Sequence, residues 1–152
     1  MRTLSKLFIS VVLVGCGTVG GNRSISEFRV ELRPQCGDHT RLVVTKNRAK
    51  REFVSNCGGP SGKTERRISM AQWEALTRLA GEGNFFDLPA EVSQPENSDG
   101  SISIMTDDTH ICVTAIGPKG SHVVCGEWLA LKLNPRTQQL FTLVERLERV
   151  SE

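Results

Sequence analysis

A short turn motif in the last third of the chain constrains the fold more than any other feature. The G-P-K-G segment at 117–120 is typical of a hairpin turn, and apolar residues alternate on both sides of it. A hairpin centred there pairs residues whose numbers sum to 237, so Cys112 faces Cys125 and Val113 faces Val124. Directly opposed positions have the Cβ spacing that a disulfide needs. The sequence therefore predicts a hairpin that is closed by a Cys112–Cys125 disulfide.

Hydrophobic periodicity predicts the remaining elements. The first three strands are expected at 27–33, 41–45 and 51–55. After a loop over 57–62, Ser69 begins a helix as its N-cap, with a capping box to Gln72. Ile102 and Ile104 mark a strand before the hairpin, and Asn134 with Pro135 is typical of a second helix start. The expected order is β-β-β-α-β-β-β-α. We expect an α+β fold in which two helices pack on one face of a mostly antiparallel sheet.

Two more cysteines flank the first predicted hairpin. Cys36 precedes its first strand and Cys57 follows its second, so a second disulfide is expected. Packing Leu42 opposite Phe53 needs paired numbers that sum to 95, whereas the two cysteines sum to 93. A bulge near Gly37 would reconcile the two requirements, and the sequence leaves this register open.

The first sixteen residues have the organisation of a bacterial secretion signal. Arg2 and Lys6 form a positive n-region, and the apolar segment 7–14 is too short to span a bilayer. The L-V-G-C segment at 13–16 resembles the lipobox of bacterial lipoproteins. This resemblance implies that cleavage precedes Cys16, that its thiol receives a diacylglycerol, and that its new amino group is acylated.

The resemblance also implies a domain organisation and a location. Residues 1–15 are a signal peptide, 16–25 a lipidated Gly-rich tether, and 26–152 a single α+β domain, which is a usual size for one domain. In this class of proteins an Asp after the lipidated Cys often retains the protein in the inner membrane. Gly17 stands at that position, which implies an anchor in the outer membrane that holds the domain on the periplasmic side.

A metal site is the alternative interpretation of the second hairpin. In the predicted register His110 shares a face with Cys112, and Glu127 lies opposite His110 beside Cys125, which makes a cluster of acceptable zinc ligands. Thiolates do not persist well in an oxidising compartment, and neighbouring cross-strand positions are cramped for a tetrahedral site. We favour the disulfide, and we expect neither a metal nor another cofactor.

Charge is distributed unevenly along the chain. Residues 40–67 carry a net charge of +6 and residues 68–152 a net charge of −6, whereas the whole chain is close to neutral at +2. A near-neutral balance is not typical of nucleic-acid binding, and we expect none. The tip of the first hairpin is a candidate binding site for an acidic protein, lipid phosphates or an anionic wall polymer; its residues are Lys46, Arg48, Lys50 and Arg51. The alternative is that these side chains protect the hairpin from aggregation.

The sequence carries no recognisable catalytic motif. It lacks the G-x-S-x-G of a nucleophile elbow, and His39, His110 and His122 occur without the neighbours of a known signature. The protein is therefore expected to be non-enzymatic.

The N-F-F-D-L-P segment at 84–89 follows the first helix and precedes a polar loop and an S-I-S-I strand. This order resembles small bacterial envelope domains, including the emfourin-like domains and uncharacterised lipoprotein families. The resemblance covers about residues 66–150, and the emfourin-like group is associated with inhibition of metalloproteases. The paired cysteines are not part of the emfourin pattern, and packing of Phe85 and Phe86 accounts for the motif without a functional residue.

These features predict a non-enzymatic outer-membrane lipoprotein. Its small disulfide-bonded domain is expected to bind, and in the most concrete version to inhibit, another protein of the cell envelope. The alternative is a structural or assembly lipoprotein that contacts wall polymer or lipid head groups through the basic hairpin.

Overall fold

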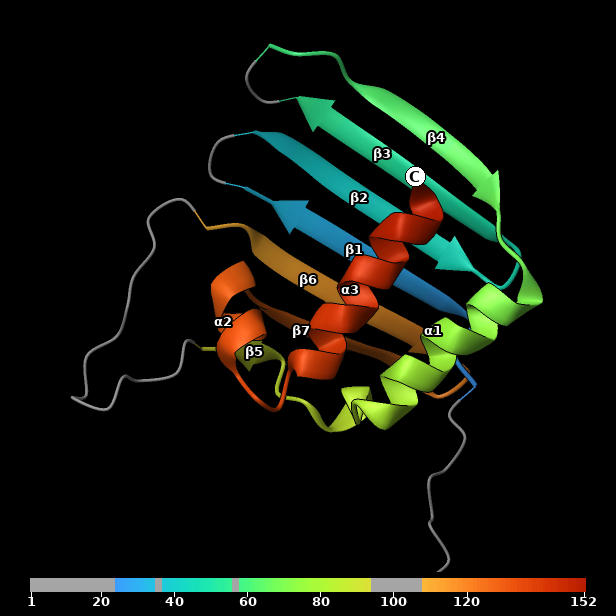
Figure 1. The fold of residues 1–152 in the computed structure, drawn as a ribbon, viewed down its shortest axis with the longest axis vertical. Helices are drawn as coiled ribbons and strands as arrows, with labels where there is room; N and C mark the ends of the chain where they lie inside the picture. The colour runs from blue at the N-terminus through green and yellow to red at the C-terminus, as the bar shows by residue number, and fades with distance from the viewer. Residues whose placement is uncertain (1–23, 35–36, 56–57, 94–107) are drawn as a thin grey trace, which may run out of the picture.

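A computed structural model describes residues 24–34, 37–55, 58–93 and 108–152 (Figure 1). The predicted signal peptide, the predicted lipidation site Cys16 and the cysteines Cys36 and Cys57 lie outside the described residues. The elements are β1 (Glu27–Arg33), β2 (Asp38–Thr45), β3 (Arg48–Ser55), β4 (Gly62–Arg67), α1 (Met70–Glu82), the 3-10 helix η1 (Phe85–Asp87), β5 (Glu91–Val92), β6 (His110–Gly117), β7 (Gly120–Glu127), α2 (Trp128–Leu133) and α3 (Gln138–Ser151).

The strands form one seven-stranded sheet with the order β4-β3-β2-β1-β6-β7-β5. Every neighbouring pair is antiparallel except β5 and β7, which run parallel. The helices α1, α2 and α3 lie on the same side of this sheet (Figure 1). The predicted α+β class and the mostly antiparallel sheet are therefore confirmed, with three helices on one face instead of two.

The element order differs from the prediction. The segment after the predicted loop forms β4, an edge strand that pairs with β3. Its sequence, G-K-T-E-R-R, has no apolar alternation, so periodicity did not mark it. The Phe53 ring packs closely on Gly62, where a Cβ atom would lie 2.7 Å from it and would force the ring to shift. The strand predicted around Ile102 and Ile104 lies outside the described residues.

The predicted start of the last helix is wrong. Asn134 is the C-cap of α2, and α3 begins later, with Thr137 as its N-cap. The hydroxyl of Thr137 is buried and donates a hydrogen bond to the Leu131 carbonyl over 2.8 Å. The Asn134 side-chain oxygen accepts from the Arg136 amide over 3.0 Å. The Asn-Pro pair thus makes the turn between two helices and does not begin one.

The two hairpins show how strongly turn geometry fixes register. The predicted pairs in the second hairpin, Cys112 with Cys125 and Val113 with Val124, are confirmed. In the first hairpin the expected pairing of Leu42 with Phe53 is wrong, because Leu42 pairs with Arg51. The pairs from Asp38–Ser55 to Thr45–Arg48 all have numbers that sum to 93, since a two-residue turn joins β2 to β3.

The hydrophobic core lies between the sheet and the helices. Phe28 of β1 packs against Trp73 of α1, with 5.6 Å between the ring centroids. The capping box of Ser69 and Gln72 begins α1 as predicted. The side of α3 that faces the core consists of Leu140, Leu143, Val144 and Leu147, which are all buried. Within the described residues, no helix covers the opposite face of the sheet (Figure 1).

Candidate binding surface

The face of the sheet away from the helices, here the open face, is built from the alternation of side chains along each strand. In β1 the buried residues Phe28, Val30 and Leu32 point to the helices, so the odd-numbered residues point the other way. The open face therefore consists of the odd-numbered side chains of β1 and the residues that pair with them across the neighbouring strands. It is one broad surface that crosses the sheet.

Charges alternate along the central row of the open face. From β4 to β1 this row reads Lys63, Glu52, Arg41 and Glu31, each directly opposite the next. Lys63 Nζ lies 2.8 Å from the Glu52 carboxylate, and Arg41 Nε lies 3.4 Å from that of Glu31. Beyond Glu31 the row continues into Cys112 on β6. This row of the open face therefore carries charges of alternating sign and ends at the disulfide.

The ion pairs lower the pKa of two carboxyl groups on this face. Partial burial by itself raises the pKa of Glu31, but the hydrogen bond from Arg33 and the charges of Arg33 and Arg41 outweigh it, so this pKa lies below its ordinary value. The hydrogen bond and charge of Lys63 lower the pKa of the exposed Glu52. Both carboxylates are therefore held in the charged form that pairs with the basic residues.

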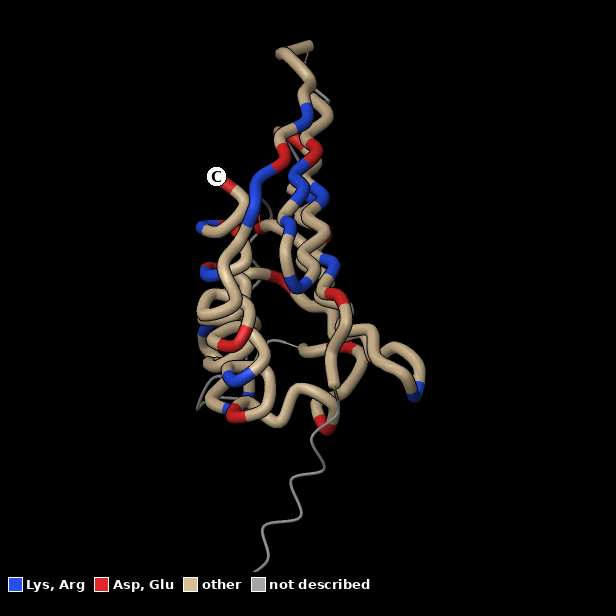
Figure 2. Tube along the Cα trace, turned by 90° about the vertical axis from the view of Figure 1, so that its right-hand side faces the viewer, with Lys and Arg blue, Asp and Glu red and all other residues tan. Residues whose placement is uncertain are grey.

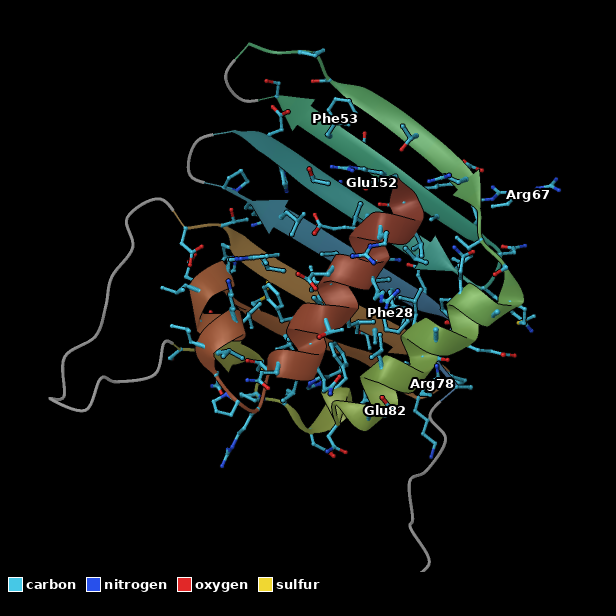
Figure 3. All side chains as sticks on the ribbon, viewed as in Figure 1. Phe28, Phe53, Arg67, Arg78, Glu82 and Glu152 are labelled. Atoms are coloured by element: carbon cyan, nitrogen blue, oxygen red, sulfur yellow. A yellow bond between two sulfur atoms is a disulfide. The ribbon has the colours of Figure 1, made fainter. Side chains whose placement is uncertain are left out.

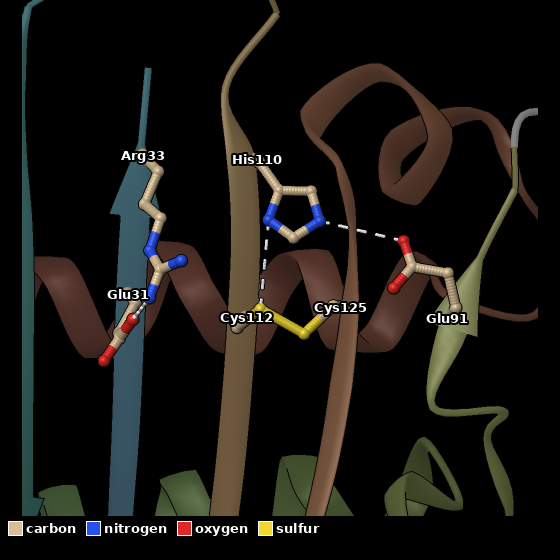
Figure 4. The surroundings of a disulfide bond; sticks show 6 residues. All are labelled: Glu31, Arg33, Glu91, His110, Cys112 and Cys125. Atoms are coloured by element: carbon tan, nitrogen blue, oxygen red, sulfur yellow. Dashed lines mark hydrogen bonds and ion pairs between the residues drawn. A yellow bond between two sulfur atoms is a disulfide. The ribbon is translucent and has the colours of Figure 1, made fainter. Parts of the chain in front are cut away.

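The disulfide Cys112–Cys125 lies on the open face (Figure 4). His110 Nδ1 lies 3.9 Å from the Cys112 sulfur, and its Nε2 lies 3.7 Å from the Glu91 carboxylate of β5. Glu127 pairs with His110 as the register predicted. The bonded sulfur atoms are not the thiolates that a zinc ion binds. In the part of the chain that the structure describes, no group of three or more His, Cys, Asp or Glu side chains could hold a metal ion.

The structure divides the predicted basic hairpin between two faces. Lys50 lies on the open face, whereas Arg51, the next residue, points toward the helices because side chains alternate along a strand. Arg51 is half-buried, and its guanidinium lies 3.6 Å from the Glu152 carboxylate at the end of α3 (Figure 3). Arg51 is therefore not part of a common surface with Lys46, Arg48 and Lys50.

Other basic residues replace Arg51 in the predicted basic surface. Arg67 of β4 lies directly opposite Arg48 of β3, and it projects from the end of its strand (Figure 3). We use the name basic end for this end of the sheet, and its residues are Lys46, Arg48, Arg66, Arg67 and Lys119. Figure 2 shows how densely Lys and Arg follow one another on the strands of this region. Arg66 and Arg67 belong to the basic segment 40–67 of the sequence. Their place at this end of the sheet was not predicted, because β4 was not predicted.

The contact between Arg51 and α3 brings charged groups together without giving each of them a full set of partners. Arg51 Nε is buried and has no hydrogen-bond partner among the described residues. Burial raises the pKa of Glu148, the charge of Arg51 acts in the opposite direction, and Glu152 and Glu145 add to the increase. The C-terminal turn of α3 therefore rests on β3 through a partly compensated set of charges.

The three histidines lie apart. His39 is on the open face of β2, with a buried Nε2 that has no hydrogen-bond partner in the described residues. His122 lies on the helix side, where its Nε2 is 3.0 Å from the Leu88 carbonyl and its ring contacts Phe85. Phe85 is buried, so the F-F-D-L-P segment acts in packing as expected.

A hollow of about 370 Å³ lies between the C-terminal end of α1 and the α2–α3 connection. Its lining includes Glu82, Asn84, Asp87 and Arg136. These side chains provide polar contacts, and none of the described residues that line the hollow is a serine, cysteine or histidine. Within the described residues, no helix is both long and apolar enough to cross a membrane.

No protein-family model matches this sequence, and comparison with the curated proteins found no match either. The likeness of the N-terminal segment to a lipobox and of residues 66–150 to emfourin-like domains therefore rests on the motifs alone. The functional argument has to come from the surfaces described above.

Proposed function

We propose that this chain is a non-enzymatic outer-membrane lipoprotein whose disulfide-bonded domain binds another protein of the cell envelope through the open face. Inhibition of a secreted or invading hydrolase is the most concrete form of such binding. The observation that carries the proposal is the open face itself, a broad polar surface of the sheet that the helices leave uncovered (Figure 1).

The disulfide supports the proposed compartment. Disulfides persist in oxidising surroundings such as the bacterial periplasm and are rare in the cytosol. The Cys112–Cys125 bond joins directly opposed residues of the neighbouring antiparallel strands β6 and β7. It agrees with the export that the basic n-region, the apolar segment 7–14 and the lipobox-like segment at 13–16 predict.

Charge on the open face indicates the kind of protein partner. On β1 to β4 this face carries seven basic side chains against four acidic ones, which are Glu27, Glu31, Glu52 and Glu65. The exposed apolar side chain of Val54 lies on β3 among these charges, and that of Val123 lies on β7 of the same face. A rigid surface of this kind suits a partner that presents acidic side chains around a small apolar contact, because charge complementarity speeds association and selects partners.

Four exposed apolar residues allow a matched test. Val54 and Val123 lie on the open face, whereas Met70 and Leu133 belong to α1 and α2 on the other side. A photo-crosslinking amino acid is placed at each position in turn in the full chain, in its own cells. The proposal predicts the same single protein adduct from Val54 and Val123 and none from Met70 or Leu133. Adducts from the helix-side positions only, or from none of the four, would contradict it.

The captured protein is then tested in purified form. Arg41→Glu reverses a charge at the centre of the open face, and Arg78→Glu makes the same change on α1 (Figure 3). We expect the first variant to bind at least tenfold more weakly and the second to bind as the wild type does. Equal affinity of both variants would place the binding site elsewhere.

A second disulfide is part of the proposal. The numbers of Cys36 and Cys57 sum to 93, which is also the sum for every pair of the β2–β3 ladder. Continuation of this register beyond Asp38 and Ser55 would oppose the two cysteines without a bulge. Peptide mapping without reduction should recover a Cys36–Cys57 peptide pair; free thiols at both positions would reject this bond.

The alternative function is an assembly role in which the basic hairpin contacts wall polymer or lipid head groups. The gathering of Lys46, Arg48, Arg66 and Arg67 at one end of the sheet favours it. Arg51 has no part in this version, because it contacts Glu152 on the helix side. Binding to an anionic polymer would weaken steeply with salt, whereas an interface held by packed apolar contacts would weaken less.

A further inference from the structure

We propose that the basic end is the membrane-facing end of the domain and contacts the phosphates of anionic phospholipids in the leaflet that holds the anchor. This inference rests on the lipid anchor at Cys16 in the proposed function. It adds an orientation of the domain and the chemistry of a second binding surface, distinct from the open face.

The described chain enters the domain at the basic end. The Ser26 amide donates a hydrogen bond to the Ile116 carbonyl over 2.7 Å, just before the β6–β7 turn. The Ser24 carbonyl oxygen packs so closely on Gly117 that a Cβ atom there would lie 2.8 Å from it. Any chain that leads from Cys16 therefore reaches the domain beside this turn, which carries Lys119 at its tip.

The strand register places the other basic residues at the same end. Glu27, the first residue of β1, pairs with Thr45 of β2, which pairs with Arg48 of β3, which pairs with Arg67 of β4. Lys46 follows Thr45 in the β2–β3 turn. Glu27 also pairs with Ile116, so the β6–β7 turn is at this end. The two turns are separated by about three strand spacings, or roughly 14 Å.

Pairing distinguishes this end from the rest of the sheet. On the strands and their turns, seven basic residues have carboxylate partners: Arg29, Arg33, Arg41, Arg48, Lys50, Arg51 and Lys63. Lys46, Arg66, Arg67 and Lys119 have no ion-pair partner within the described residues, and all four are exposed. The unpaired basic charge of the sheet is thus collected where the chain enters from the anchor.

The acidic groups at this end are few and engaged. Glu27 is paired with Arg29, and Glu65 lies between Arg48 and Lys50. The first turn of α1, which follows Arg67 after a two-residue connection, has no acidic residue. An N-terminal helix turn adds partial positive charge. The field at the basic end therefore favours an anion.

A lipid anchor would hold this end close to the bilayer. Ser24 is eight positions after Cys16, and eight chain steps can span at most roughly 26–29 Å. Ionic screening acts over about 8–10 Å in physiological salt. An anchor of this reach lets the basic end approach the leaflet to within the screening length, where the surface potential of an anionic leaflet attracts Lys and Arg side chains.

Vesicle binding tests this contact without the anchor. The processed chain, residues 16–152, is prepared with Cys16→Ala so that it carries no lipid. It is sedimented with vesicles of phosphatidylcholine alone or of phosphatidylcholine with phosphatidylglycerol. We expect association only with the phosphatidylglycerol vesicles, and release by added salt. Equal binding to both kinds of vesicle, or to neither, would overturn the inference.

Charge reversal locates the surface. The double variant Lys46→Glu with Arg67→Glu changes two exposed residues of the basic end. The matched control, Lys132→Glu with Arg146→Glu, changes the net charge equally on the exposed surfaces of α2 and α3. Each basic side chain near an anionic surface is worth about fivefold in binding, so the first variant should lose more than about 25-fold and the control little.

Thermal unfolding of both variants verifies that they fold. A similar loss of vesicle binding in the two variants would overturn the inference. Binding to soluble polyphosphate without association with vesicles would indicate a polymer ligand and would also overturn it. Lipidation of Cys16 is measured separately, by the presence or absence of fatty acid on Cys16 in cells. A lipidated Cys16 with no vesicle binding would reject only the membrane contact.

Discussion

Arg48 and Arg67 lie directly opposite each other on β3 and β4, although both side chains are positively charged. Like charges in this position destabilise a sheet by about 0.2–1 kcal/mol. Glu65 relieves part of this repulsion, because its carboxylate lies 3.0 Å from Arg48 Nε, but it is shared with Lys50 at 3.7 Å. The pair does not favour the stability of the sheet. We expect such a pair on a surface that binds an external anion.

Arg67→Gln should therefore stabilise the isolated domain while it weakens binding to anionic vesicles. We expect the free energy of unfolding in urea to rise by a few tenths of a kcal/mol, and by at most about 1 kcal/mol. Lys63→Gln is the control, because it removes the pairing partner of Glu52 at 2.8 Å and so should not stabilise. A less stable Arg67→Gln variant would show that Arg67 is a structural residue.

The cross-strand disulfide should contribute strongly to stability. Replacement of both Cys112 and Cys125 by Ala removes a link across a sequence separation of 13 residues. The free energy of unfolding should fall by about 2–4 kcal/mol. Chemical denaturation of the variant and of the oxidised wild type measures the difference. A change below about 1 kcal/mol would mean that the β6–β7 hairpin is held by its packing alone.

Glu31 should make the stability depend on pH in the acid range. Its pKa is lowered in the folded protein because the arginine partners outweigh partial burial, so its contribution is present above the unfolded-state pKa and is lost as the pH falls through the folded-state pKa. Glu31→Gln should cost about 1 kcal/mol or less at neutral pH. The difference from the wild type should vanish in acid. A difference that stays constant as the pH falls would contradict this account.

Glu148 should act with the opposite sign. Burial raises its pKa in the folded protein, so the ionised form is disfavoured there and stability is lost as the pH rises through the folded-state pKa. Glu148→Gln should therefore stabilise the protein at neutral pH, and the gain should shrink as the pH is lowered. Thermal melts across this pH range measure it. A variant less stable than the wild type at neutral pH would show that Glu148 is needed to compensate Arg51.

The sequence predicted well wherever a turn or an apolar pattern fixed the geometry. The 117–120 turn set the register of Cys112 with Cys125, since a shift by one residue would have moved Val113 and Val124 off the core face. The first hairpin was ambiguous, because opposing Leu42 with Phe53 and opposing Cys36 with Cys57 required two different registers. Only the two-residue turn after Thr45, seen in the structure, decides that register.

Other features were not accessible to sequence patterns. β4 consists of polar residues at a sheet edge, so its pairing with β3 leaves no hydrophobic signature. Asn134 and Pro135 have the residue types of a helix start, but the buried hydroxyl of Thr137 fixes the start of α3 further along. The candidate site changed for the same reason: without β4, Arg66 and Arg67 could not be placed beside Lys46.

The proposed anchor at Cys16 underlies both the proposed location and the proposed orientation, and one measurement tests it directly. The protein is isolated from the membranes of its own cells, and its amino-terminal peptide is analysed by mass spectrometry. The proposal predicts a chain that begins at Cys16 and carries a diacylglycerol on sulfur and an acyl group on nitrogen. A chain that retains residues 1–15, or that has an unmodified Cys16 thiol, would contradict it.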